Sequence, residues 1–112
     1  MSTKYYNKLV RDKIPELIES EGQTCKTRVL RDEEYLKELR TKLQEEVQEY
    51  LDSGDLEEIA DVLEVLDGLA VAQGSSVSEV VDLQKLKRKE RGGFSERIFL
   101  ESVTSQQVTE AT

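Results

Sequence analysis

The chain contains no histidine, no tryptophan and only one cysteine among its 112 residues. Without histidine, most zinc sites and every catalytic triad or general base built on imidazole are excluded. The single cysteine, Cys25, excludes an intramolecular disulfide. Any chemistry must therefore use carboxylates, amines, hydroxyls or a metal ion.

Long apolar runs are also lacking. No run approaches the roughly 18 residues of a membrane span, and the N-terminal residues MSTKYYNK lack the apolar stretch of a secretory signal. Twenty-four acidic residues against sixteen basic ones give a formal charge of -8, which argues against a general surface for nucleic-acid polymers. We expect one cytoplasmic domain, residues 1–101, without a membrane partner, followed by a disordered polar tail, residues 102–112.

Apolar residues at helical spacing, together with glycine stops, predict four helices. These helices are expected after Asp12 up to Gly22, from Asp32 to Ser53, from Asp55 to about Gln73, and from Ser76 to the Gly92-Gly93 pair. The two long helices are joined by so short a turn that they must be antiparallel neighbours. Apolar residues on the second long helix cover more surface than one partner helix can bury, which predicts at least a homodimer.

Two short segments have the composition of strands. One is TCKTRVL, residues 24–30, in which the β-branched residues occur in an alternating pattern. The other is FSERIFLESV, residues 94–103, which we expect to pair with the first. The expected fold is therefore all-α, an antiparallel helix bundle with a minor pair of short strands.

Acidic residues form a spaced pattern on the two long helices. The first long helix carries Glu45, Glu46 and Glu49, and the second carries Glu58 and Asp61. Acids that border apolar surfaces lose hydration and repel one another, a cost that a divalent cation offsets. An all-oxygen ligand set favours magnesium or manganese over zinc. The alternative is that these acids are solvated charges and that Glu58 only caps its helix with Asp55.

The sequence EEVQE at 45–49 followed by EIAD at 58–61 resembles the EExxE...ExxD motif of the all-α nucleoside triphosphate pyrophosphohydrolases, the superfamily that includes MazG, all-α dUTPases and phosphoribosyl-ATP diphosphatase. YNKLVRDKIPE at 6–16, the segment VLRDEEYLKELRTKLQEE and RGGFSERIFL at 91–100 look like a MazG-like subgroup of predicted phosphoribosyl-ATP pyrophosphohydrolase-like proteins. The resemblance covers nearly the whole chain up to Glu101.

This resemblance implies a function and a site. By position in the motif, magnesium (or manganese) is bound by Glu46, Glu49, Glu58 and Asp61, and Glu45 assists through a second metal ion or the attacking water. Glu45 and Glu46 are the expected catalytic acids. The implied reaction cleaves a nucleotide between its α and β phosphates and releases a monophosphate and pyrophosphate. Removal of unwanted nucleotides is the implied role.

A triphosphate also needs cations for the oxygens that a metal ion does not contact. The expected substrate-binding residues are Arg11, Lys13, Lys42, Arg88, Arg91 and Arg97. Basic residues equally complement the dipole at the end of a helix, and Lys42 is spaced for an intrahelical ion pair with Glu46. Two other functions stay open: a catalytically silent acidic module that binds a nucleotide or a protein, and a true phosphoribosyl-ATP diphosphatase.

Overall fold

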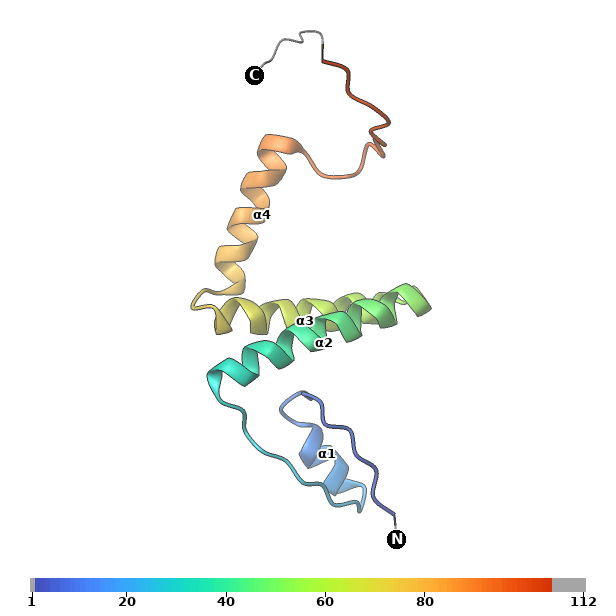
Figure 1. The fold of residues 1–112 in the computed structure, drawn as a ribbon, viewed down its shortest axis with the longest axis vertical. Coiled ribbons are helices and arrows are strands. Elements are labelled where there is room, and N and C mark those ends of the chain that lie inside the picture. The colour runs from blue at the N-terminus through green and yellow to red at the C-terminus, as the bar shows by residue number, and fades with distance from the viewer. Residues whose placement is uncertain (1, 106–112) are drawn as a thin grey trace. The chain divides into compact units, whose positions relative to one another are not determined.

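A computed structural model describes residues 2–105, and within them the chain is entirely helical (Figure 1). The helices are α1 (Ile14–Ser20), α2 (Asp32–Ser53), α3 (Leu56–Ala72) and α4 (Val77–Arg91). All four predicted helices are present, and the bounds of α2 are those predicted. Pro15 lies in the first turn of α1, where its missing N–H removes no helical hydrogen bond. The all-α class is confirmed.

The predicted pair of strands is wrong. Residues 24–30 and 94–103 contain no strand. Val29 in the first segment is 97% exposed, and Phe99 in the second is 86% exposed. A strand is stabilised by a neighbouring backbone and by packing of one face, so composition alone does not produce it. Neither segment buries its large apolar side chains, and the second begins with a turn in which the backbone N–H of Arg97 donates to the carbonyl of Phe94 at 3.1 Å.

The turn between α2 and α3 differs in one detail from the prediction. Gly54 ends α2 with a φ of 71°, a left-handed conformation that favours glycine. Asp55 stands at the start of α3 but forms no side-chain cap. The backbone N–H of Glu58 instead donates to the backbone carbonyl of Asp55, at 3.1 Å. The capping role considered for Glu58 is therefore not realised, and its carboxylate is free for other contacts.

The core lies between α2 and α3, which run antiparallel and side by side (Figure 1). Leu39 from α2 packs with Val65 and Leu69 from α3, and each of the three is at most 9% exposed. At Gly68 an added Cβ atom would come within 3.2 Å of a methyl carbon of Leu39, so glycine permits this close approach. Each buried leucine contributes about 1.5–3 kcal/mol, so the contact between α2 and α3 contributes substantially to the stability of the fold.

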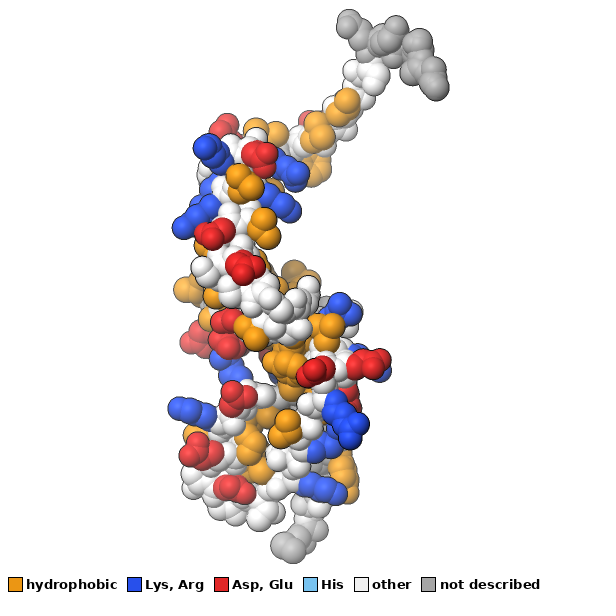
Figure 2. All heavy atoms as spheres, turned by 90° about the vertical axis from the view of Figure 1, so that its left-hand side faces the viewer, with side chains coloured by type: hydrophobic (Ala, Val, Ile, Leu, Met, Phe, Trp, Pro, Cys, Tyr) orange, Lys and Arg blue, Asp and Glu red, His pale blue; other side chains and the backbone are white. Residues whose placement is uncertain are grey.

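A second apolar row on α3 stays exposed. Leu56 is 81% exposed, Leu63 58% and Leu66 42%. Figure 2 shows apolar side chains at the surface between acidic and basic ones. The larger apolar coverage that the sequence predicted for this helix is therefore present, and α2 covers only one side of it.

The chain divides into two compact units, Met1–Val81 and Asp82–Thr112. The first contains α1, α2 and α3, and the second begins within α4. Residues 102–105 of the predicted tail form no helix or strand, and 106–112 lie outside the described residues. The prediction of one domain over 1–101 stays a prediction. Within 2–105, no helix is long and apolar enough to cross a membrane.

Candidate functional site

Glu46 is the one buried charged residue among the described residues, with 7% of its surface exposed. It lies seven residues, about two turns, after Leu39 on α2, which places it on the side of the helix that faces α3. Its Oε1 atom is 3.3 Å from the Nζ atom of Lys42. Its Oε2 atom is buried and has no hydrogen-bond partner. A buried carboxylate oxygen without a partner is costly, so this position favours a cation.

Two acids from α3 face Glu46. One carboxylate oxygen from each of Glu46, Glu58 and Asp61 lies within 4.8 Å of the others. Magnesium ligands stand about 2.1 Å from the ion, which limits the distance between any two of them to roughly 4.2 Å. Small side-chain rotations would therefore bring these three oxygens to magnesium-binding distances. The donor set consists of oxygens alone, which magnesium and manganese prefer.

The electrostatics of the acids agree with a shared site. Partial burial and repulsion by the Asp61 carboxylate raise the pKa of Glu58. The pKa of Glu49 is also raised, because Glu46 stabilises its protonated form by a hydrogen bond and repels its charged form. Glu49 is exposed and lies outside the three-oxygen group. These carboxylates thus crowd one another, and a divalent cation would relieve the repulsion.

Glu45 belongs to a different arrangement. The Nζ atoms of Lys42 and Lys8 both lie 3.3 Å from its Oε1 atom. Partial burial opposes ionisation, but the two ammonium groups prevail and lower the pKa of Glu45. Glu45 is consequently held as a charged base beside the acid group rather than as one of its members.

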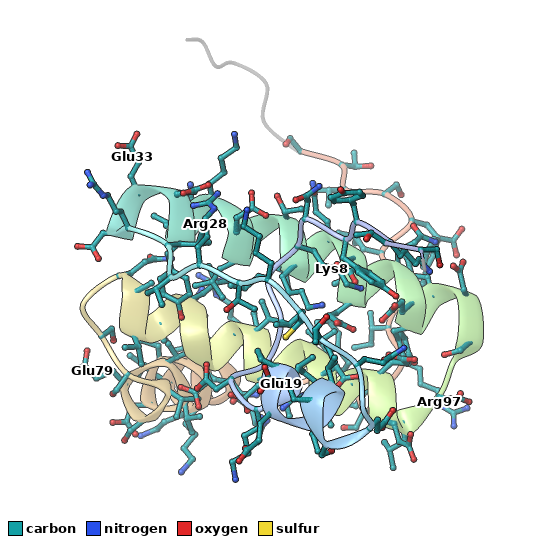
Figure 3. All side chains as sticks on the ribbon, turned by 90° about the horizontal axis from the view of Figure 1, so that it is seen from below. Lys8, Glu19, Arg28, Glu33, Glu79 and Arg97 are labelled. Atoms are coloured by element: carbon teal, nitrogen blue, oxygen red, sulfur yellow. The ribbon has the colours of Figure 1, made fainter. Side chains whose placement is uncertain are left out.

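Arg11 provides a further cation from the segment before α1. Its Nη2 atom donates to Oδ1 of Asp61 at 2.8 Å, and its Nη1 atom is 4.0 Å from Glu64. Lys8, labelled in Figure 3, precedes Arg11 on the same irregular segment. The sequence predicted a binding role for Arg11 but missed Lys8. The sequence did contain a signal, since Lys8 belongs to the segment YNKLVRDKIPE, which resembles the MazG-like subgroup.

A pocket of about 390 Å³ joins these groups. Its lining residues are Lys8, Val10, Arg11, Ile14, Lys42, Glu46, Glu49, Glu58 and Asp61. The pocket thus includes all four predicted metal ligands and two of the predicted substrate-binding cations. A larger depression of about 750 Å³ lies along the first half of α2 and contains none of the predicted site residues.

The remaining predicted cations lie elsewhere. Lys13 immediately precedes α1 and does not line the pocket. Arg88 and Arg91 are in the last turn of α4, where they complement its dipole, and Arg97 follows with a φ of 60°. These three arginines belong to the unit Asp82–Thr112, whereas the pocket belongs to the unit Met1–Val81. Their role in substrate binding stays a prediction.

Comparisons with known proteins give little further information. No model of a known protein family matches the chain, and no solved structure matches it. A protein of Mycolicibacterium smegmatis (strain ATCC 700084 / mc(2)155), described as an uncharacterized protein, is 56% identical over 41 residues. The match covers 37% of this chain and 42% of that protein, so it spans less than half the length of either.

Proposed function

We propose that this protein is a magnesium-dependent nucleoside triphosphate pyrophosphohydrolase of the all-α, MazG-like superfamily. The observation that carries the proposal is the buried Glu46 carboxylate, whose unpartnered oxygen lies in a group with Glu58 and Asp61. The EExxE...ExxD resemblance implies these three residues, together with Glu49, as metal ligands. Spacing in the sequence and burial in the fold therefore support the same residues.

The residues present fit a divalent cation. Glu46, Glu58 and Asp61 would hold it, and Glu49, which the resemblance also implies as a ligand, lines the same pocket. When bound, magnesium or manganese supplies neutralisation of phosphate charge and activation of water. Four acids in one small pocket otherwise repel one another, which gives the protein a reason to bind the ion.

The chain's own residues then have separate tasks. Water attacks a phosphorus atom of the α–β anhydride, the bridging P–O bond breaks, and a nucleoside monophosphate and pyrophosphate leave. Glu45 does not line the pocket, but Lys8 and Lys42, which do, hold it in its charged form, and in this form it would accept the proton of this water. Lys42 and Arg11 line the pocket and are available for phosphate oxygens. Removal of unwanted nucleotides is the role that we propose.

The decisive experiment compares two neighbouring glutamates of α3. Glu58 lines the pocket, and Glu57 is exposed and does not. Purified wild type, Glu58→Gln and Glu57→Gln are incubated with a panel of nucleoside triphosphates and phosphoribosyl-ATP, with magnesium and then with EDTA. We expect pyrophosphate release that requires magnesium, survives in Glu57→Gln and is lost in Glu58→Gln. Equal release by both variants would refute the proposal.

A catalytically silent binding module is the second candidate, and one observation favours it. Arg11 already neutralises Asp61, and Lys42 contacts both Glu45 and Glu46, so the chain's own cations compensate much of the acidic charge. A nucleotide that raises the melting temperature without product formation, for every member of the panel, would support this function instead.

We also propose that a second copy of the chain covers the exposed row on α3. Leu56, Leu63 and Leu66 form an apolar surface on a single helix, and the same surface on a twofold-related copy is complementary to it. Within 2–105 only four apolar residues are buried, so additional burial would stabilise the fold substantially. Sedimentation at micromolar concentration is expected to show a dimer, and a monomer there would contradict it.

A further inference from the structure

The pocket contains cations that the chain itself supplies from a distant segment. Lys8 and Arg11 precede α1, and they contact acids that follow them by 37 and 50 residues. The segment is also anchored by Leu9, which packs against the core between α2 and α3. Its backbone between Ser2 and Lys13 forms no helix or strand. The two charged side chains therefore reach the pocket on an irregular segment that is anchored at Leu9.

These two ion pairs are weak enough for other charged groups to compete with them. The side chains of Lys8 and Arg11 are 42% and 55% exposed, and ion pairs that are open to water are weak. A divalent cation near Asp61 would both compete for its carboxylate and repel the guanidinium. Arg11 would then lose Asp61 and keep only Glu64, whose carboxylate is 4.0 Å from Nη1, while Leu9 holds the segment against the core.

A guanidinium that keeps only this distant carboxylate has N–H groups without an acceptor, and a phosphate group offers two oxygens to them. We propose that Arg11 is a displaceable counter-ion, which neutralises Asp61 in the metal-free protein and binds the phosphate oxygens of the ligand once a divalent cation has entered, and that Lys8 binds the same phosphate group while it stays paired with Glu45. This inference rests on the proposed function and adds an order of binding: metal ion first, di- or triphosphate second.

The two cations differ in a way that makes the order testable. Arg11 contacts Asp61, which belongs to the group of three carboxylates, so it competes with a metal ion. Lys8 contacts Glu45, which lies outside that group, so it does not compete. Removal of the Arg11 side chain should therefore increase the affinity for the metal ion and decrease the affinity for the anion. Removal of the Lys8 side chain should decrease only the affinity for the anion.

Titration calorimetry on the full chain measures both events. Magnesium alone is the first probe, and inorganic pyrophosphate with magnesium saturating in both solutions is the second. For Arg11→Gln we expect magnesium to bind about two- to fivefold more tightly and pyrophosphate about tenfold more weakly. For Lys8→Gln we expect unchanged magnesium affinity and weaker pyrophosphate binding. Lys4→Gln is the control, because Lys4 lies on the same segment but does not line the pocket.

The outcomes separate this inference from the proposed function. If wild type binds no magnesium, or if Glu46→Gln binds it equally well, the metal site and the proposed function both fail. If magnesium binding depends on Glu46 but Arg11→Gln leaves it unchanged, only the counter-ion inference fails. Weaker binding of both probes by Arg11→Gln would show a purely structural role and would also overturn it. Equal binding of pyrophosphate with and without magnesium would overturn the order.

Discussion

The two sides of α3 are both apolar in sequence, but they have different surroundings. One side packs against α2 through Val65 and Leu69, and it carries Glu58 and Asp61 at its border. The other side carries a row of leucines, among them Leu63, that stays exposed. The side that α2 covers is the side that carries the acids, so the core and the candidate site are formed by the same helix contact. Hydrophobicity alone does not distinguish the two sides, whereas the position of the acids does.

The largest expected effect tests this difference directly. Leu69 and Leu63 are on the same helix and are 9% and 58% exposed. Leu69→Ala should lower the free energy of unfolding by about 2 kcal/mol or more, because it leaves a cavity in a small core. Leu63→Ala should cost about 0.5 kcal/mol or less in dilute protein. Urea unfolding at two protein concentrations measures both, and a cost for Leu63→Ala that appears only at the higher concentration would indicate the proposed dimer.

The next effect concerns the acids beside the covered side. Magnesium at a hundred times its dissociation constant should stabilise the wild type by about 2.7 kcal/mol through mass action. Glu46→Gln should abolish this stabilisation, because Glu46 contributes the buried unpartnered oxygen. Glu33→Gln, a change at an exposed acid of the same helix, should keep it. Thermal unfolding with and without magnesium measures the difference, and equal shifts in the two variants would contradict the site.

In the absence of metal, we expect a smaller effect of pH on the stability of the folded protein. The pKa of Glu58 is raised in the folded protein by partial burial and by Asp61, so the folded state binds this proton more tightly than the unfolded state. Stability should therefore increase as the pH falls from about 7 through the raised pKa of Glu58. Glu58→Gln should reduce the increase. Melting temperatures in EDTA measure it, and an identical profile for both proteins would argue against crowding of the acids.

The smallest effect on stability is expected for an exposed ion pair that does not line the pocket. Arg28 contacts both oxygens of Glu34, at 2.9 and 2.6 Å, and its hydrogen bonds lower the pKa of Glu34. This contribution to stability is present above the unfolded pKa of Glu34 and is lost as the pH falls through the lowered one. Because both side chains are open to water, Glu34→Gln should lower the melting temperature only slightly. The decrease should disappear in about 1 M salt, and one that persists would indicate a structural role.

Local sequence signals predicted the helices well because those signals act over a few residues. The bounds of α2 follow from an uninterrupted apolar spacing and from Gly54, whose left-handed φ ends the helix. The same reasoning was wrong for residues 24–30 and 94–103, since a strand needs a partner that neighbouring residues do not provide. It also left the role of Glu58 open between a cap and a metal ligand, because both use the same carboxylate.

The sequence by itself therefore determined where helices begin and end, and which acids recur at a spacing of three on the two long ones. The tertiary structure decided which side of α3 meets α2, and with it the burial of Glu46 beside Glu58 and Asp61. It also brought Lys8 and Arg11 to acids 37 and 50 residues away. Helix bounds depend on interactions within a turn or two, whereas contacts over such separations depend on the path of the whole chain.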